Sequence, residues 1–524
     1  MKSILHLEIE LNKDLEPQKE EIFALWRETE ASCLWEDQDP ESYASELSGS
    51  GQKITWKLSS TALPVHQKLL EFKNRLMPLL GRDYRLGIRT LRVAHYLYEF
   101  SLEEPFEGEI SVPFVKSLTF QGSSGTVEFA GLTEEFLRHD YINRIVKRVR
   151  EKIKEKQYAG KGEYWELLWK SEEKKMLFRE DPTNEFIARH WIKQGPTRGK
   201  WFLGPQVTRL MRTMEHIALK EVLEPLGFQE VMQPTHEAFD SLLKTGHLSG
   251  MPGEFYYISE PSTRNPEEWE RFIDLVKITK KVPEDELAKR LAPPRAIACY
   301  VQCPNIYWSF SGMTIANESF PILVFDRAAV SNRYESRGRH GLERVDEFHR
   351  IEPVYIGFPE QLLALRDRFI ERYKYVFNEI LDIEWRMAWV TPFYLQQAGI
   401  AGVEETDRKE KGTIDFEAYM PYKGPREQAE WLEFQNLSIL GDKYTGAFNI
   451  KAQDGILWSG CSGIGLERWT MAFLAQKGFD IRHWPEKFQD YFGSFPDEIK
   501  LHQMVKQAKR LGRDNDEKQS GGNK

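Results

Sequence analysis

Alternating apolar and polar positions begin the chain and predict half-buried strands. Residues 4–9 (ILHLEI) and 53–58 (KITWKL) alternate at every second position, which is the period of a strand with one buried face. Apolar residues then recur at helical spacing over 17–33 and 64–80, and this spacing predicts amphipathic helices. Residues 1–165 are therefore predicted to form an α+β domain.

The last helix of this domain, predicted over 133–157, is apolar on one side and basic on the other. Its apolar stripe comprises Ile142, Ile145, Val149 and Ile153, and the basic residues that lie largely elsewhere are Arg144, Lys147, Arg148, Lys152 and Lys156. A second basic stretch over 68–92 contains Lys73, Arg75 and Arg89. Two interpretations stay open: such runs are usually solvated helix faces, but they are also candidates for contact with an RNA backbone.

The remainder of the chain changes in character twice. A polar segment with two glycines at 158–163 predicts a linker, and residues 166–505 mix long helices with strands, which predicts a second domain. Residues 506–524 contain almost no apolar side chains and are predicted to be a disordered tail. A chain of 524 residues also exceeds the size of one hydrophobic core, so several domains are expected.

Composition narrows the class of protein. No apolar run approaches the length that crosses a bilayer, and the first ten residues carry acids instead of a basic leader, so we expect a cytoplasmic protein without a membrane partner. Four cysteines are too few and too scattered for a disulfide framework. A net charge of −9 gives no general attraction to nucleic acid, so RNA binding must come from local basic patches.

Residues 324–352 contain two predicted strands joined by an arginine-rich loop. On such a hairpin an arginine can neutralise a phosphate under attack, and an aromatic ring can stack on a purine. Arg333 and Phe348 on these two strands are candidates for such roles, and Glu335 lies two residues after Arg333. The loop adds Arg337, Arg339 and Arg344 as candidates for holding phosphates.

Two further segments flank this hairpin in the sequence. Residues 224–234 (EPLGFQEVMQP) predict a helix end, a glycine break and a strand stopped by proline, a pattern that many α/β proteins share. Residues 459–469 (SGCSGIGLERW) place glycines where a strand meets a helix and supply Arg468 as a fixed charge for a triphosphate. A Walker A sequence and a dinucleotide Gly-x-Gly-x-x-Gly fingerprint are both absent from the sequence.

In this order the three segments resemble motifs 1, 2 and 3 of class II aminoacyl-tRNA synthetases. The resemblance implies a catalytic domain built on an antiparallel sheet flanked by helices, an N-terminal α+β tRNA-binding domain, and a homodimer formed through the motif 1 region. It makes Arg333 and Arg468 the expected catalytic residues and Lys73, Arg75 and Arg89 the candidates for tRNA contact.

Residues 415–421 (DFEAYMP) and 430–442 (EWLEFQNLSILGD) are similar to seryl-tRNA synthetases, and blocks over about 160–495 resemble their zinc-dependent methanogenic type. This resemblance implies one zinc ion per subunit, held by Cys303, Glu352 and Cys461, with an open fourth position for the amino group of serine. The alternative is that these cysteines are small buried apolar residues. The family pattern leaves out Cys299, although it lies four residues before Cys303.

The same resemblance supplies the other site residues. The expected ATP-binding residues are Arg333, Glu335, Arg344, Phe348, Glu433 and Arg468, with Glu433 holding Mg²⁺. The expected serine-binding residues are Glu352, Gln397, Asn436 and Ser438, because a buried hydroxyl needs polar partners. Phe393 stands where the family usually has a tryptophan, so the shape of the pocket for threonine stays open.

The expected function is therefore that of a serine–tRNA ligase. It would activate L-serine with ATP to seryl-adenylate and transfer the seryl group to the 3′ end of tRNA(Ser), with tRNA(Sec) raised as a second substrate. Two alternatives stay open. One is a class II enzyme with a zinc pocket for threonine, and the other is a synthetase paralogue that binds RNA or a small amino metabolite without charging tRNA.

Overall fold

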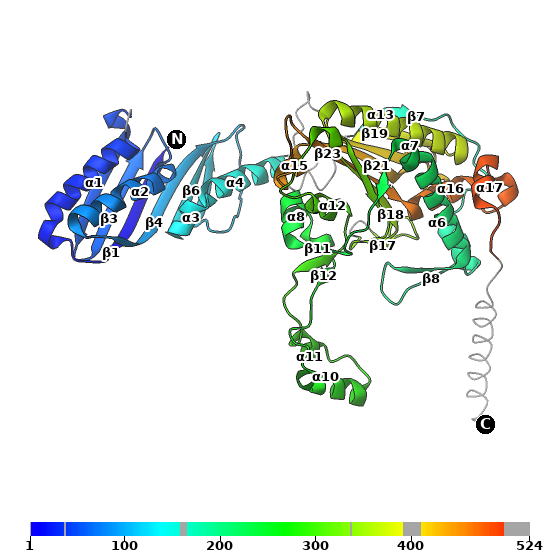
Figure 1. The fold of residues 1–524 in the computed structure, drawn as a ribbon, viewed down its shortest axis with the longest axis horizontal. Coiled ribbons are helices and arrows are strands. Elements are labelled where there is room, and N and C mark those ends of the chain that lie inside the picture. Colours follow the sequence, from blue (N-terminus) through cyan, green and yellow to red (C-terminus); the bar gives the residue numbers. More distant parts are fainter. Residues whose placement is uncertain (1, 36–37, 158–164, 336–337, 391–409, 497–524) are drawn as a thin grey trace. The chain divides into compact units, whose positions relative to one another are not determined.

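The computed structural model describes residues 2–35, 38–157, 165–335, 338–390 and 410–496 of the chain (Figure 1). The chain divides into two compact units, Met1–Gly162 and Glu163–Lys524, whereas the sequence placed the boundary after residue 165. The predicted linker and the predicted tail both lie outside the described residues.

The first unit is an antiparallel sheet covered on one face by helices. Its strand order is β2-β3-β1-β4-β6-β5. The strands are β1 (Ser3–Leu11), β2 (Tyr43–Ser50), β3 (Lys53–Ser60), β4 (Ile88–Ser101), β5 (Ser117–Gln121) and β6 (Ser124–Thr133), and the main helices are α1 (Lys19–Leu34) and α2 (Leu69–Leu79). In β1 every second residue from Leu5 to Leu11 is buried, as the alternation predicted. Both predicted strands and the α+β class are thus confirmed.

The helix predicted over 133–157 is interrupted. It forms α3 (Glu134–Arg138) and α4 (Tyr141–Gln157), and Asp140 between them has a φ of 56° in the left-handed region. Aspartate tolerates this conformation better than most residues, so the break needs no glycine. The apolar stripe packs into the core as expected, with Val146 as an additional buried member.

The second unit is built on an eight-stranded sheet with the order β10-β15-β18-β23-β21-β20-β19-β7. All neighbouring pairs are antiparallel except β10 and β15. The strands are β7 (Trp165–Lys170), β10 (Gln229–Glu230), β15 (Ile322–Asp326), β18 (Arg350–Gly357), β19 (Trp385–Val390), β20 (Gly412–Ala418), β21 (Leu432–Gly441) and β23 (Trp458–Gly465). This is the antiparallel sheet that the sequence predicted.

Three long helices cover one face of this sheet. They are α6 (Pro205–Ala218), α13 (Pro359–Tyr375) and α16 (Leu466–Lys477). Their buried side chains, such as Leu210, Phe369 and Phe473, share one core with Phe416 of β20. The opposite face is left for the shorter elements and the site. Burial of this apolar surface is the main force that holds the unit together.

Short elements complete the second unit. The short helices are α5 (Pro182–Ala188), α7 (Glu224–Leu226), α8 (Phe239–Thr245), α9 (His247–Gly250), α12 (Cys303–Ser309), α15 (Lys443–Ala447) and α17 (Glu486–Phe492). The short strands are β8 (Ile192–Gln194), β9 (Trp201–Leu203), β11 (His236–Ala238), β12 (Tyr257–Ile258), β13 (Ala296–Ala298), β14 (Thr314–Ile315), β16 (Ser331–Asn332), β17 (Glu347–Phe348) and β22 (Lys451–Ala452). The helices α10 (Pro266–Thr279) and α11 (Glu284–Ala288) lie between β12 and β13 and project from the body in Figure 1. Within the described residues, no helix combines the length and the apolar character needed to cross a membrane.

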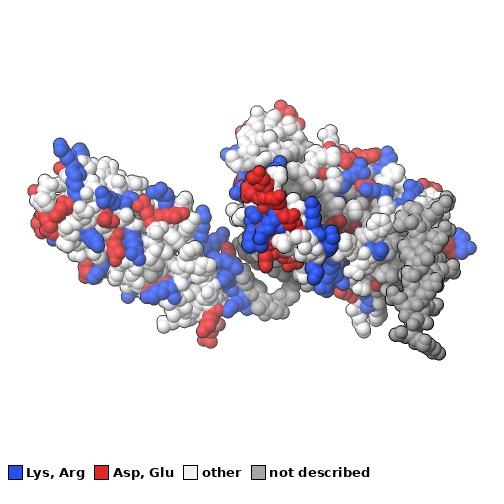
Figure 2. Space-filling model, turned by 90° about the horizontal axis from the view of Figure 1, so that it is seen from below, with Lys and Arg blue, Asp and Glu red and all other residues white. Residues whose placement is uncertain are grey.

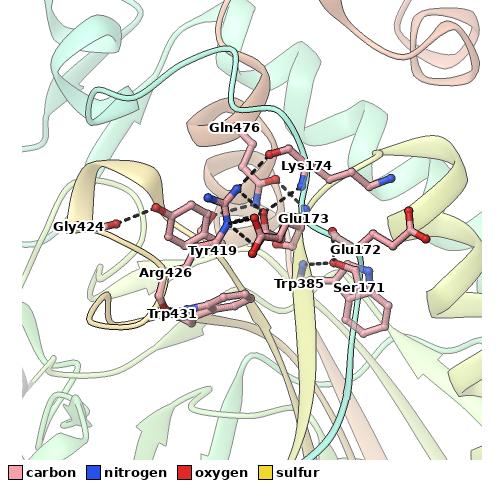
Figure 3. A network of polar contacts seen from close by, with 11 residues as sticks. Ser171, Glu172, Glu173, Lys174, Trp385, Tyr419, Gly424, Arg426, Trp431 and Gln476 are labelled. Atoms are coloured by element: carbon pink, nitrogen blue, oxygen red, sulfur yellow. Dashed lines mark hydrogen bonds and ion pairs between the residues drawn. The ribbon is translucent and has the colours of Figure 1, made fainter.

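An ion pair between the partly buried Arg426 and the fully buried Glu384 joins the loop between β20 and β21 to the residue before β19 (Figure 3). The guanidinium of Arg426 donates to both carboxylate oxygens of Glu384, with Nε 2.8 Å from Oε1, and stacks over the ring of Tyr419. Glu384 is fully buried and also accepts the backbone N–H of Lys174 at 3.1 Å. The pair therefore fixes this loop against the sheet.

Replacing Arg426 with alanine should destabilise the protein by about 3 kcal/mol, because it leaves the fully buried carboxylate of Glu384 without its ion-pair partner. The measurement is the free energy of unfolding in urea. The matched control is Lys487→Ala, which removes an exposed partner of Glu379 and should change that free energy by less than about 1 kcal/mol. Equal losses in both variants would contradict the role given to Arg426.

Candidate functional site

The face of the eight-stranded sheet that packs against α12 and α15 aligns four buried side chains across neighbouring strands. Val354 of β18 pairs with Cys461 of β23, Cys461 pairs with Ser438 of β21, and Ser438 pairs with Thr413 of β20. Residues paired across an antiparallel ladder point to the same side of the sheet. Glu352, two residues before Val354, points to this side as well.

Cys303, Glu352 and Cys461 meet at one point on this face. Their candidate ligand atoms all lie within 4.8 Å of one another, and all three side chains are buried. Among the described residues, this is the group of histidine, cysteine and acidic side chains whose spacing suits a metal ion. The structure thus brings together three residues that lie 49 and 109 positions apart in the sequence.

The chemistry of this group fits a soft divalent cation. Neither carboxylate oxygen of Glu352 accepts a well-formed hydrogen bond, although Nε of Arg350 lies 2.5 Å from Oε2 as an ionic contact. The neighbouring Cys461 thiol and burial raise the pKa of Cys303, and burial raises the pKa of Glu352. A cation at this point would reverse both shifts, because metal coordination stabilises the thiolate and the carboxylate.

A pocket of the same unit gathers four of the six predicted nucleotide-binding residues, and Arg344 and Glu433 are not part of its lining. Its lining comprises Arg333, Glu335, Leu342, Glu343, Val345, Phe348, Gly465, Glu467 and Arg468. Arg333 forms an ion pair with Glu335, and Nη1 of Arg468 donates to the backbone oxygen of Glu433 at 2.7 Å and to its carboxylate at 3.2 Å. The hairpin and the strand–helix junction therefore converge as the sequence predicted.

Glu433 contacts Arg468 of this pocket through its backbone oxygen and its carboxylate. Burial alone would raise the pKa of Glu433, but the guanidiniums of Arg468 and Arg333 outweigh it and lower that pKa. An ionised carboxylate oxygen is a ligand of the kind that Mg²⁺ prefers. The geometry is thus compatible with the expected role of Glu433.

The loop arginines are less available than the sequence suggested. Arg339 binds Asp346 in a bidentate ion pair at 2.8 and 2.7 Å and stacks over the ring of Tyr334. Arg344 forms an ion pair with Glu430. Arg339 therefore fixes the loop and is not placed to bind a phosphate, whereas Arg337 lies outside the described residues.

Two polar residues of the predicted serine pocket have partners within the sheet. Oδ1 of Asn436 accepts the backbone N–H of Gly463 at 2.9 Å, and the hydroxyl groups of Ser438 and Thr413 lie 2.8 Å apart. The amide nitrogen of Asn436 stays a potential donor to a substrate hydroxyl. Gln397 and Phe393, also assigned to this pocket from the sequence, lie outside the described residues.

Sequence reasoning missed Thr413 and Arg350. Arg350 is nearly buried and contacts Glu352, and it approaches β23 so closely that a Cβ on Gly463 would lie 2.3 Å from its guanidinium. Glycine at position 463 therefore makes room for Arg350. The signal in the sequence was the strand period, since Arg350 lies two residues before Glu352 and shares its side of β18.

The three candidates for tRNA contact differ in their surroundings. Nζ of Lys73 lies 2.5 Å from Glu134, Arg75 lies 3.5 Å from Glu71, and Arg89 is exposed. On the face of the first unit seen in Figure 2, basic side chains are interspersed with acidic ones. The charge of Lys73 is thus neutralised within the protein by Glu134. Arg89 is the candidate with the freest access to a phosphate.

Comparison with known proteins gives consistent matches. A family model described as a tRNA-binding domain matches residues 1–151. Type-2 serine–tRNA ligases from Methanococcoides burtonii and Methanothrix thermoacetophila are 42% and 40% identical to the chain, over 86% and 96% of its length and 91% and 100% of theirs. Among solved structures, M. kandleri SerRS in complex with A. aeolicus tRNA(Sec) matches with a TM-score of 0.80 at 26% identity, covering 95% of this chain and 98% of that one.

Proposed function

The chain belongs to the type-2 serine–tRNA ligases, class II aminoacyl-tRNA synthetases, and from this premise we propose how its site works. Cys303, Glu352 and Cys461 hold a zinc ion, Arg333 and Arg468 act on ATP, and the reaction passes through seryl-adenylate. The observation that carries the proposal is the convergence of three buried ligand atoms within 4.8 Å beside the arginine-lined pocket.

The zinc assignment is supported by the donor set. Two thiolates and one carboxylate are ligands that suit Zn²⁺, and three protein ligands leave one tetrahedral position open. Zinc bound there supplies a Lewis-acidic position for the amino group of serine. The carboxylate of Glu352 is fully buried, and its Oε1 has no hydrogen-bond partner although Arg350 contacts Oε2, which supports a second cation beside it.

In the first step a carboxylate oxygen of serine attacks the α-phosphorus of ATP in line. The bond from that phosphorus to the bridging oxygen breaks, and pyrophosphate leaves with the bonding electrons. Arg333 and Arg468 stabilise the negative charge that develops on the phosphates, and Phe348 stacks on the adenine. Glu433 would hold the Mg²⁺ that accompanies ATP.

In the second step the 3′-hydroxyl oxygen of the terminal tRNA ribose attacks the carbonyl carbon of seryl-adenylate. An ester bond forms, AMP leaves, and the hydroxyl proton is lost to the departing phosphate or to water. This chain's residues contribute positioning and electrostatics, so no nucleophilic side chain is required. The N-terminal unit is the part that we assign to tRNA, with Arg89 as the first candidate among its basic residues.

We assign selectivity for serine to the polar side chains that β20 and β21 place near Cys461. Asn436 offers its amide nitrogen to the substrate hydroxyl, and the Ser438 and Thr413 hydroxyl pair lies next to Cys461 on the neighbouring strands. A site built to hydrogen-bond a hydroxyl rejects an analogue that lacks it, because its own polar groups are then left unpaired. Alanine should therefore be a poor substrate.

The partners follow from the family. We propose tRNA(Ser) as the substrate, tRNA(Sec) as a second one, and a homodimer joined through the region of residues 224–234. The tRNA(Sec) assignment is supported by the match to the M. kandleri protein, which was solved with that RNA. The proposed place of action is the cytoplasm.

The experiment is amino-acid-dependent exchange of labelled pyrophosphate into ATP, with serine, threonine, alanine and cysteine, before and after zinc removal. Exchange with serine that is lost with zinc and restored by it would support the reaction and the pocket together. Exchange with threonine would favour a threonine-specific enzyme, and no exchange with any amino acid would favour a paralogue. Serine-dependent exchange that is unchanged by zinc removal would refute the metal assignment and leave the assigned reaction intact.

Arg344 offers a smaller test of the ATP pocket. Its ion pair with the exposed Glu430 must break before it can reach a phosphate, so Glu430→Gln should lower the KM for ATP. An exposed pair is worth at most about 1 kcal/mol, which limits the change to about fivefold. Glu427→Gln, in the same loop, is the control and should leave the KM for ATP unchanged. Both variants should leave the KM for serine unchanged.

A further inference from the structure

Cys303 differs from the other two candidate ligands in how it is held. Glu352 and Cys461 lie on β18 and β23, whose ladder pairs Val354 with Cys461 and so fixes the distance between the two strands. Cys303 is instead the first residue of the short helix α12 and takes no part in that ladder. Other contacts must therefore set its position against the two strands.

Gln302 provides one such contact, on the side of Glu352. Its side chain is fully buried, and Nε2 donates to the backbone oxygen of Arg350 at 3.1 Å and to that of Ala329 at 2.8 Å. Arg350 lies two residues before Glu352 on β18. The amide thus ties the residue next to Cys303 to the strand that carries Glu352.

Tyr307 provides the matching contact on the side of Cys461. It lies four residues after Cys303, which places both side chains on the same face of α12. Its ring is fully buried in the cluster that contains Cys303 and Cys461, and its hydroxyl donates to the backbone oxygen of Gly460 at 2.7 Å. Gly460 immediately precedes Cys461, so the hydroxyl ties α12 to the second ligand strand.

We propose that Gln302 and Tyr307 are positioning residues that hold the Cys303 thiol at bonding distance from a metal ion shared with Glu352 and Cys461. The inference rests on the zinc site proposed above and names the residues that set its affinity. Each tether reaches within two residues of one of the other ligands. The geometry of the three donors is therefore determined before the ion arrives.

The same segment has tethers that do not reach the ligand strands. Nδ2 of Asn305 donates to the backbone oxygens of Pro234 and His236 at 3.1 and 3.0 Å. Asn305 thus docks α12 on the segment leading into β11, and its loss removes two hydrogen bonds from this helix. Asn305→Ala is for that reason a matched control for Tyr307→Phe and Gln302→Met.

The test uses full-length protein and measures metal affinity directly. Zinc is titrated against a chromophoric chelator, and the d–d absorption of the Co²⁺-substituted protein reports the ligand geometry. Loss of groups that orient metal ligands typically weakens binding by about 10- to 100-fold. We expect Tyr307→Phe and Gln302→Met each to weaken zinc binding by that factor and to alter the Co²⁺ spectrum, whereas Asn305→Ala lowers the Tm and leaves both unchanged.

The remaining outcomes separate this inference from the zinc assignment. Wild-type affinity and an unchanged spectrum in both tether variants would overturn the positioning role while leaving the zinc site intact. An equal loss in Asn305→Ala would also overturn it, because general docking of α12 would then be enough. Failure of the wild-type protein to bind zinc would overturn the zinc site itself. Tyr307→Phe removes a single oxygen, so its fold can be checked by circular dichroism beside Gln302→Met.

Discussion

Replacing Cys461 with serine is expected to abolish zinc retention and to lower serine-dependent pyrophosphate exchange by more than about 100-fold. Loss of an outer group that only orients a ligand costs up to about 100-fold, and loss of a ligand itself should cost more. A hydroxyl is a much poorer zinc ligand than a thiolate, and only two protein ligands would remain. The side chain is small and the swap is nearly isosteric, so the sheet should not repack. Zinc content and exchange rate are the two measurements.

Cys299→Ser is the matched control for this variant. Cys299 is fully buried, lies four residues before Cys303, and is not one of the three residues whose ligand atoms converge. Zinc content and exchange should both stay at the wild-type level in this control. A Cys461→Ser protein that keeps one zinc ion per chain and full exchange would exclude Cys461 as a ligand, while loss of zinc from Cys299→Ser would point to a different ligand set.

The convergence of these ligands shows what periodicity can and cannot predict. The strand period correctly predicted β1 and β3, because each alternates over six or more residues with one buried face. No spacing rule brings Cys303 to Cys461, which are 158 residues apart by their numbers. Their assignment came from family resemblance, and the structure supplies the physical reason, a shared face of one sheet next to α12.

Partner choice among charged side chains was the least predictable part of the site. Arg339 looked like a phosphate ligand because it lies in an arginine-rich loop, yet it binds Asp346 seven residues later. The pairing depends on how the loop folds back. It also needs a glycine at position 199, because a Cβ there would lie within 2.7 Å of the side chains of both Arg339 and Asp346. Such three-body contacts leave no local pattern in the sequence.

The sequence also did not reveal a left-handed backbone conformation adopted by a residue other than glycine. The helix predicted through 133–157 breaks at Asp140, and the usual marker of such a break, glycine, is absent there. Register-dependent contacts failed for a related reason. The hydroxyl pair of Thr413 and Ser438 exists only because β20 and β21 align these two positions, and a shift of one residue would move both to the other face.

Loss of the Arg333 guanidinium should reduce catalysis. We expect Arg333→Ala to lower the rate of serine-dependent exchange by about 10²- to 10³-fold, the usual cost of removing one group that stabilises transition-state charge. The rate constant should fall more than the affinity for ATP, because Phe348 and Arg468 still line the pocket. Single-turnover formation of seryl-adenylate separates the two effects.

Two controls decide whether that loss is electrostatic. Arg333→Lys keeps a positive charge but loses the planar fork, so it should recover only part of the rate. Arg327→Ala removes an arginine from the end of β15 whose partners, Glu215 and Glu230, lie outside the pocket lining, and it should keep the wild-type rate. Because Glu335 loses its ion-pair partner in Arg333→Ala, the Tm must be measured as well. Two outcomes would assign Arg333 to stability: an equal rate loss in Arg327→Ala, or a rate per folded molecule of Arg333→Ala that equals the wild-type rate. Arg468 would then be the remaining candidate for stabilising the charge on ATP.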